Sequence, residues 1–188
     1  GKSLCYQAPA VFQGGTTIVV SPLIALMKDQ VDRLRNVGIS AIRLDSSLTA
    51  DERENAEQIL ASGQVRLLFV SPERLAVPGF AYSLCQHNIR SVAIDEAHCI
   101  SQWGHDFRPD YRQLGRLREL FPGVSIHAYT ATATPQVRSD IITQLGLVEP
   151  DVIVGTFDRP NLTYRILPRL ETIRQVRQVI DRYPGSAG

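Results

Sequence analysis

Short runs of apolar and β-branched residues alternate along this chain with longer stretches in which apolar residues recur every three or four positions. The short runs predict strands, and the longer stretches predict amphipathic helices. Strands are expected over 16–20, 41–44, 66–70, 91–94 and 124–129. Because parallel strands need crossover connections, this alternation predicts an α/β fold with a mostly parallel sheet and helices on both faces.

Boundary residues support two of the expected helices. A helix over 22–37 is expected to end at Gly38, since glycine readily adopts the left-handed conformation found after helices. Thr49 stands three residues before Glu52, which is the pattern of a capping box, and the helix that it starts should stop near Gly63.

The sequence pattern changes after residue 150. We interpret residues 1–150 as one domain. Two β-rich stretches, 152–154 and 162–167, then precede an expected helix over 171–183. We interpret 151–188 as a connecting segment that leads to a further domain, and both ends of the chain as cuts within a longer protein.

Composition excludes several classes of protein. With 44% apolar residues in 188, the chain can bury a sizeable core. Twenty basic against 19 acidic residues give a formal charge of +1, so a polyanion site must be local. Three cysteines without a C-x-x-C pair argue against a disulfide framework and fit a reducing compartment. The apolar runs are strand-sized, so we expect no membrane span and a cytoplasmic location.

Two adjacent carboxylates, Asp95 and Glu96, follow the strand expected at 91–94. Ligands of open parallel sheets bind at the carboxyl ends of the strands. Phosphoryl transfer needs one carboxylate to hold Mg²⁺ against the phosphates and another group to orient or deprotonate the attacking water. We assign Asp95 to the metal and Glu96 to the water. For an isolated Asp-Glu pair, simple helix capping is the alternative.

The first three residues, Gly1-Lys2-Ser3, match the end of the phosphate loop G-x-x-x-x-G-K-[ST]. In that loop backbone N–H groups cradle phosphates, the Lys reaches the β and γ oxygens, and the hydroxyl binds Mg²⁺. Three residues match often by chance, but the carboxylate pair supplies the missing context. The sequence therefore predicts a site for ATP and Mg²⁺ that uses Gly1, Lys2 and Ser3 together with Asp95.

Residues 99–111 hold the only Trp of the chain, Trp103, among other aromatic and basic side chains, without helical or strand periodicity. One interpretation is a hydrophobic plug over the sheet. The other is a platform on which exposed bases stack, with Arg108 as a phosphate contact or cation–π partner. The position directly after the carboxylate pair favours the platform. His98 and His105 lie in the same block, and we interpret both as functional.

Hydroxyl groups follow other expected strands. They belong to Ser21-Pro22, to Ser71-Pro72 and to the alternating Thr130, Thr132 and Thr134. Each Ser-Pro turn is expected to open a helix whose N-terminus can receive a backbone phosphate, although capping alone would explain both. The threonines are either strand-end caps or a relay between nucleotide and nucleic acid. Cys85 and His87 lack two further ligands for zinc, and His127 is interpreted as structural.

Five segments taken together resemble the RecQ family of ATP-dependent DNA helicases. They are GKSLCYQ at 1–7, VVSPLIALMKDQV at 19–31, DEAHCISQWGHDFRPDY at 95–111, TATAT at 130–134 and FDRPN at 157–161. The resemblance runs in order through essentially the whole chain. Its most specific part is 95–111, where the aromatic-rich loop distinguishes this family from other DExH proteins.

The resemblance implies the first RecA-like domain, with a P-loop NTPase fold, of a motor that moves 3′ to 5′ on single-stranded DNA and unwinds partly duplex DNA in repair and recombination. By position, Lys2 and Ser3 bind the triphosphate and Mg²⁺, Asp95 the metal and Glu96 the water. The implied DNA-binding and coupling residues are Ser21, Pro22, Ser71, Pro72, His98, Gln102, Trp103, His105, Phe107, Arg108, Thr130 and Thr132. In a bacterium this motor would be nucleoid-associated.

RecQ helicases also contain segments that lie outside this chain. Upstream are the rest of the phosphate loop and a glutamine motif that reads adenine. Downstream are a second RecA-like domain with an arginine finger and a zinc-binding and winged-helix region, so no zinc site is expected here. Because an arginine finger is worth about 10³–10⁵ in rate, we expect the isolated chain to be inactive or nearly so. The sequence does not indicate an oligomeric state.

Two other functions compete with this interpretation. The first is an RNA-directed DExH ATPase, and the aromatic-rich stretch 99–111 argues against it. The second is a degenerate, non-catalytic scaffold domain. The adjacent carboxylates Asp95 and Glu96 argue against the scaffold, since a scaffold does not need them.

Overall fold

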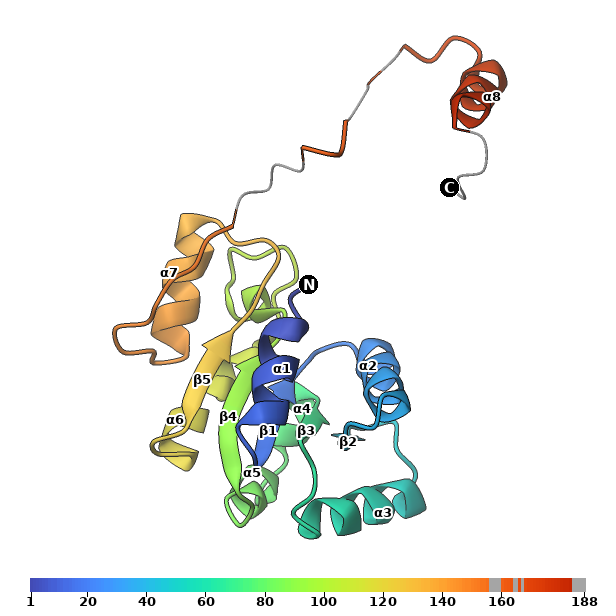
Figure 1. Ribbon diagram of the computed structural model, residues 1–188. Helices are drawn as coiled ribbons and strands as arrows, with labels where there is room; N and C mark the ends of the chain where they lie inside the picture. Colours follow the sequence, from blue (N-terminus) through green and yellow to red (C-terminus); the bar gives the residue numbers. More distant parts are fainter. Residues whose placement is uncertain (156–159, 164–165, 167, 184–188) are drawn as a thin grey trace. The chain divides into compact units, whose positions relative to one another are not determined.

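The computed structural model describes residues 1–155, 160–163, 166 and 168–183. The chain divides into two units, Gly1–Pro150 and Asp151–Gly188 (Figure 1). Among the described residues, no helix is long and apolar enough to cross a membrane. Cys5, Cys85 and Cys99 are all free thiols.

The first unit is built on a sheet of five parallel strands in the order β2-β3-β1-β4-β5 (Figure 1). The strands are β1 (Thr16–Val20), β2 (Ala41–Leu44), β3 (Leu67–Val70), β4 (Ile89–Ile94) and β5 (Ser125–Ala128). Val20 pairs with Val70 on one side and with Ile94 on the other, so these strands end level with one another. The predicted parallel sheet is confirmed.

Helices connect the strands. The α-helices of the first unit are α1 (Leu4–Phe12), α2 (Ile24–Asn36), α3 (Ala50–Ala61), α4 (Pro72–Ala76), α5 (Phe80–Leu84), α6 (Leu117–Leu120) and α7 (Pro135–Gln144). Two 3₁₀ helices, η1 (Ala97–Ile100) and η2 (Pro109–Arg116), lie between β4 and α6. The second unit contains α8 (Thr172–Arg182), none of whose residues is buried.

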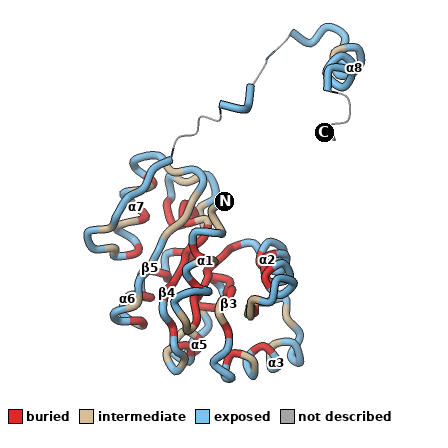
Figure 2. The backbone as a smooth tube through the Cα atoms, viewed as in Figure 1, coloured by how far each residue is buried: buried red, intermediate tan, exposed pale blue. Residues whose placement is uncertain are grey.

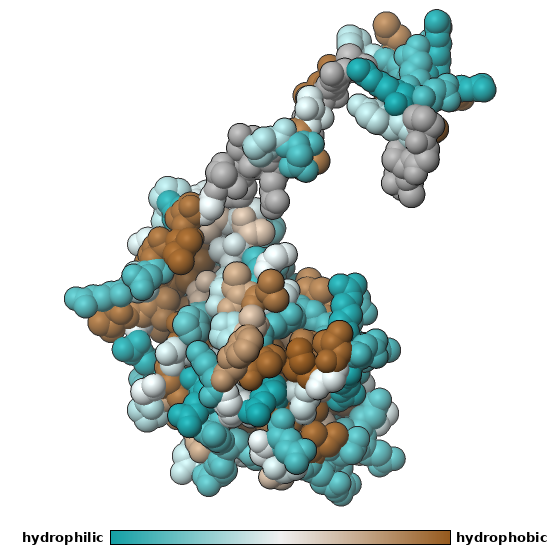
Figure 3. Space-filling view, viewed as in Figure 1, coloured by the Kyte–Doolittle hydropathy of each residue, from teal (hydrophilic) through white to brown (hydrophobic). Residues whose placement is uncertain are grey.

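The core has two parts, one on each face of the sheet. Alternate strand residues such as Val19 and Phe69 pack with Tyr6 of α1 and Met27 of α2. The other alternate residues face helices α3 to α7, where Tyr111 is fully buried. Burial on both faces explains why the central strand β3 is a continuous apolar run. Figure 2 shows the buried residues concentrated along the strands, and the face seen in Figure 3 is mostly hydrophilic with separate hydrophobic patches.

The predicted capping box of α3 is confirmed by both of its hydrogen bonds. The Glu52 N–H donates to Thr49 Oγ1 at 3.2 Å, and the Thr49 N–H donates to Glu52 Oε2 at 2.9 Å. Gly38, which was predicted to end α2, has a φ of +79°. The N–H of the next residue, Ile39, donates to the carbonyl of Leu34. This is the geometry of a glycine-ended helix.

Three sequence expectations are wrong. Helix α2 begins at Ile24, so Ser21-Pro22 does not open a helix. Residues 99–111 include parts of two 3₁₀ helices, whose short turns have no apolar period to detect. The stretch 152–154 is exposed and is not a strand, since no neighbouring strand pairs with it in the described part of the chain. The strand expected over 162–167 and the motif at 157–161 fall partly outside the described residues.

Candidate functional site

The polar residues that follow the strands lie side by side at one edge of the sheet, here termed the carboxyl edge: Ser71 after β3, Ser21 after β1, Asp95 after β4 and Thr130 after β5. Backbone hydrogen bonds continue the sheet beyond the strand ends. The Ser21 N–H donates to Val70 O at 3.2 Å, and the Asp95 N–H donates to Val20 O at 2.8 Å. The sheet therefore brings together groups that are up to 109 positions apart in the sequence.

The start of α1 approaches the carboxylate pair at this edge. Lys2 Nζ lies 2.6 Å from Glu96 Oε1 and 3.6 Å from Asp95 Oδ1. Lys2 is partly exposed, Glu96 is half-buried and Asp95 is buried. The structure thus joins the predicted phosphate-loop lysine to both predicted carboxylates, and Ser3 follows Lys2 directly as the N-cap of α1.

Asp95 is held in place from several sides. Tyr111 Oη donates to the Asp95 carbonyl at 3.0 Å, and Tyr6 Oη lies 3.5 Å from Asp95 Oδ2. Tyr6 Oη also donates to Gln30 Oε1 at 2.9 Å. Burial raises the pKa of Asp95, while the nearby charge of Lys2 opposes that rise. Burial likewise raises the pKa of Tyr6 to about 12, so the phenol stays protonated at neutral pH.

Glu96 has a left-handed backbone, with φ 47° and ψ 44°. The conformation is sustained by hydrogen bonds from Glu96 N–H to Asp95 Oδ1 at 3.0 Å and from Ala97 N–H to Tyr129 O at 2.9 Å. Such a conformation costs a non-glycine residue about 1 kcal/mol, and strain of this kind concentrates at functional sites. With the backbone turned in this way, the side chains of two neighbouring residues, Asp95 and Glu96, both reach Lys2.

His98 connects Glu96 to the threonine run. Its Nδ1 lies 2.9 Å from Thr130 Oγ1 and 3.4 Å from Glu96 Oε2. The ring stacks on His105 with 4.2 Å between the ring centroids. Burial, with His105 as the next contribution, lowers the pKa of His98, so the ring is neutral at pH 7. Thr132 takes part locally, because its N–H donates to Thr130 Oγ1 at 3.2 Å.

Residues 99–111, here termed the aromatic loop, have both buried and exposed members. Tyr111 is fully buried, whereas Trp103 is 68% exposed, so the plug interpretation is wrong for Trp103. Gln102 is exposed beside it. Phe107 is half-buried under Arg112, whose guanidinium carbon lies 5.3 Å from the ring centroid. The loop therefore presents an apolar ring to solvent next to the carboxylate pair.

Arg108 links the aromatic loop to the turn after β1. Its guanidinium pairs with Asp106 at 3.1 Å and donates to the Pro22 carbonyl at 3.3 Å. The hydroxyl of Ser21 is fully buried and has no hydrogen-bond partner among the described residues. The prediction that Ser71-Pro72 opens a helix is confirmed. Ser71 caps α4 by accepting from the Arg74 N–H at 3.3 Å, and Pro72 lies in the first turn.

Sequence reasoning missed the residues that hold Asp95 and those that hold the aromatic loop. Tyr6, Gln30 and Tyr111 form the hydrogen bonds around Asp95, whereas Ser101, Asp106 and Asp140 form contacts of the aromatic loop. A signal existed for Gln30, which is a polar residue within the apolar stripe that includes Met27, Val31 and Leu34. The other contacts depend on tertiary structure.

The residues at the carboxyl edge fit a magnesium nucleotide. Mg²⁺ in such sites is bound by one or two carboxylates together with substrate phosphates and water, rather than by a full set of protein ligands. Asp95 and Ser3 could supply oxygens, and Lys2 could meet phosphate charge. The described residues contain no group of three or more His, Cys, Asp or Glu placed to hold a metal ion.

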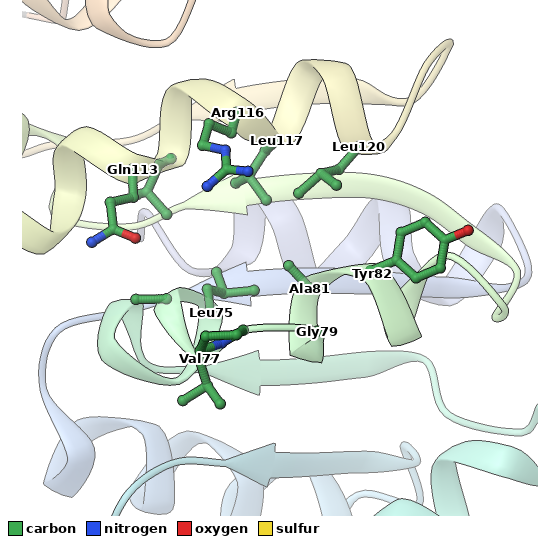
Figure 4. Close-up of a pocket in the computed structure, with 12 residues that line it drawn as sticks. Leu75, Val77, Gly79, Ala81, Tyr82, Gln113, Arg116, Leu117 and Leu120 are labelled. Carbon is green, nitrogen blue, oxygen red and sulfur yellow. The ribbon is translucent and has the colours of Figure 1, made fainter.

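A separate apolar cavity of about 340 Å³ lies between the α4–α5 segment and the η2–α6 segment (Figure 4). Leu75, Tyr82, Leu117 and Leu120 are among its lining residues. Neither Lys2 nor the carboxylate pair lines it. The cavity is therefore not part of the candidate site.

The removal of the Tyr6 hydroxyl should destabilise the first unit. We expect Tyr6→Phe to lower the free energy of unfolding by about 1 kcal/mol, the usual contribution of one buried hydrogen bond. The loss stays small because Gln30 Oε1 still accepts from Gln7 Nε2 at 3.0 Å. Urea unfolding of the chain measures it, with Tyr82→Phe as the control because Tyr82 is 67% exposed. Equal stability of Tyr6→Phe and the unmodified chain would contradict the hydrogen bond.

A parallel sheet with a lysine at the start of the first helix and two carboxylates at the end of a central strand defines a P-loop NTPase domain. A sequence profile of the DEAD/DEAH box helicase family matches residues 1–141. The chain belongs to this family.

Curated relatives refine the assignment. The chain is 48% identical to "ATP-dependent DNA helicase RecQ" of Pasteurella multocida (strain Pm70) and 44% identical to the protein of that name from Bacillus subtilis (strain 168). Both matches cover 100% of the chain, but only 30% and 32% of those proteins. The chain therefore spans about a third of their length. The resemblance to RecQ helicases is confirmed.

Solved structures agree on the fold. The helicase domain of Hef from Pyrococcus furiosus matches with a TM-score of 0.59 at 18% identity, over 78% of this chain and 31% of that one. Mycobacterium smegmatis Lhr, bound to ssDNA and AMP-PNP, matches with a TM-score of 0.53 at 22% identity, over 75% of this chain and 20% of that one. These likenesses confirm the expected α/β P-loop helicase fold.

Proposed function

We propose that this chain is the ATP-binding motor domain of a RecQ-like 3′–5′ DNA helicase, which couples ATP hydrolysis to movement on single-stranded DNA and to unwinding in repair and recombination. The observation that carries the proposal is the contact of Lys2 with Glu96 at 2.6 Å and with Asp95 at 3.6 Å. A second RecA-like domain in the same protein would complete the motor. A cytoplasmic, nucleoid-associated location fits this role.

Each residue of the site then has a chemical task. Lys2 binds the β and γ phosphate oxygens, while Gly1 and Ser3 contribute backbone and hydroxyl groups at the start of α1. Mg²⁺, held by Ser3 and Asp95, would neutralise the charge of the phosphates. Glu96 orients and deprotonates the attacking water. Its carboxylate has one oxygen on Lys2 and the other near His98, which fixes its direction.

The DNA strand is proposed to lie along the carboxyl edge and the aromatic loop. Trp103 is exposed and can stack on a base, and Arg108 stands near the turn after β1. Ser71 and Pro72 start α4 on the same edge. Gln102, His105 and Phe107 belong to the loop, and His105 stacks on His98, which contacts Glu96 and Thr130. Thr132 in turn donates its N–H to Thr130. A DNA strand bound at the aromatic loop could thus affect the carboxylate of Glu96, which activates the water.

The replacement of Trp103 tests the strand-binding part of the proposal. In the whole protein that contains this domain, we expect Trp103→Ala to abolish most of the stimulation of ATP hydrolysis by single-stranded DNA. Base stacking on an aromatic ring is worth about 1–3 kcal/mol per base, or roughly 5- to 150-fold in affinity. The measurement is the ATPase rate as the DNA concentration is varied.

Tyr82→Ala is the matched control, because Tyr82 is an equally exposed aromatic residue that lies on α5, before β4. Equal loss in both variants would argue against a specific role for Trp103. Stronger stimulation by RNA than by DNA would favour an RNA-directed ATPase. DNA binding without any hydrolysis by the whole protein would favour a scaffold.

A further inference from the structure

Ser101, near the start of the aromatic loop, joins that loop to α7. Its side chain is 1% exposed, and its hydroxyl donates to Asp140 Oδ2 at 2.6 Å. The same hydroxyl accepts from the backbone N–H of Trp103 at 3.1 Å. A chain of two hydrogen bonds therefore runs from α7 to the backbone of the exposed tryptophan.

The turn that carries Trp103 is tightly folded. The Gly104 N–H donates to Ser101 O at 3.0 Å, and a Cβ at Gly104 would lie 2.5 Å from the carbonyl oxygen of His98. Only glycine fits such an approach without a backbone shift. The backbone of Trp103 is thus fixed between Ser101 and Gly104, although its side chain points into solvent.

The segment 98–111, which is the aromatic loop with His98 before it, and the segment from Thr130 to Asp140 are tied at two points. One is the contact between His98 and Thr130 at 2.9 Å, and the other is the hydrogen bond between Ser101 and Asp140. Thr134 caps α7 by accepting from Val137 N–H at 3.3 Å, so the threonine run continues directly into the helix that bears Asp140. The second tie contains no residue that contacts Lys2, Asp95 or Glu96 within the described part of the chain.

We propose that Asp140 is a positioning residue that acts through Ser101 to hold Trp103 where a DNA strand can engage it, and thereby sets how strongly DNA stimulates ATP hydrolysis. The catalytic part of this inference rests on the proposed function. The mechanical part, that Asp140 orders the loop, does not. Because the hydrogen bond between Ser101 and Asp140 is a rigid connection, a DNA strand that binds Trp103 can displace α7 and the threonine run together.

The mechanical part can be tested in the chain itself, because Trp103 is its only tryptophan. We expect Asp140→Leu and Ser101→Ala to lower the fluorescence anisotropy of Trp103 and to raise its quenching by acrylamide. Asp140→Asn keeps an oxygen that can accept from Ser101 and should behave as the unmodified chain does. Ser139→Ala, an exposed serine of α7, is the matched control. Circular dichroism shows whether each variant is folded.

The catalytic part is tested in the whole protein. We expect Asp140→Leu to reduce stimulation by single-stranded DNA about tenfold, the effect of losing a hydrogen bond to a charged group. The DNA-free rate and the KM for ATP should be unchanged, and Asp140→Asn should restore the stimulation. A merely structural role would change all of these together.

The outcomes separate the two parts. Unchanged Trp103 anisotropy in a folded Asp140→Leu chain would overturn the inference. Changed anisotropy with normal DNA stimulation would overturn the catalytic part alone. An unmodified whole protein without any DNA stimulation would overturn the proposed function and the catalytic part with it, while the fluorescence measurements still decide whether Asp140 orders the loop.

Discussion

The Glu96→Gln variant of the whole protein should hydrolyse ATP about 10²- to 10⁴-fold more slowly than the unmodified enzyme, which is the usual contribution of a general base. Gln has the same shape as Glu but cannot accept the proton of the attacking water. Lys2 and Asp95 remain, so nucleotide binding should persist. Steady-state ATPase rates with saturating single-stranded DNA, and binding of a fluorescent ATP analogue, measure the two effects separately.

The matched control is Glu57→Gln. Glu57 is also a carboxylate paired with a basic side chain, Arg74, at 3.4 Å, but it lies on α3 and is paired with neither Lys2 nor His98. Its neutralisation removes an exposed ion pair that is worth about 0–1 kcal/mol and should leave hydrolysis unchanged. Hydrolysis by Glu96→Gln at close to the normal rate would show that another group activates the water.

Strands β1 and β3 were predictable because they are buried along their whole length and consist of apolar and β-branched residues. β1 and β2 begin and end where expected, whereas β4 begins two residues earlier, at Ile89, because the exposed Arg90 interrupts its apolar run. The start of α2 was not predictable from Ser21-Pro22. A Ser-Pro pair has the same local pattern whether or not the chain turns into a helix at once, and here Leu23 remains extended.

The carboxylate pair and Lys2 were predictable because each belongs to a recognisable local pattern. Both patterns place their residues at the same edge of the sheet. Their contact is confirmed by the geometry, while their catalytic roles stay predictions. The residues that hold Asp95 and the aromatic loop could not be predicted in the same way. Tyr111 reaches the Asp95 carbonyl, and Asp140 reaches Ser101 across 39 positions, only after the sheet has formed.

The second large effect concerns the isolated 188-residue chain, which we expect to hydrolyse ATP about 10³- to 10⁵-fold more slowly than the whole protein, the contribution of an arginine finger. The charge that develops on the transferred phosphoryl group needs more than one cation. Within the described residues no arginine forms a hydrogen bond or ion pair with Lys2, Asp95 or Glu96. Arg108, the arginine of the aromatic loop considered for phosphate, is engaged by Asp106 and Pro22.

Rates of ATP hydrolysis for the isolated chain and the whole protein, at equal concentration and with the same DNA, test this expectation. The Lys2→Ala variant of the whole protein is the reference for a motor that has lost its own phosphate-binding lysine. If the isolated chain is as slow as that variant yet folded, the lost rate comes from groups outside the chain. If it hydrolyses ATP within about tenfold of the whole protein, a gap far smaller than the contribution of an arginine finger, its own residues suffice for catalysis and the requirement for a second domain is wrong.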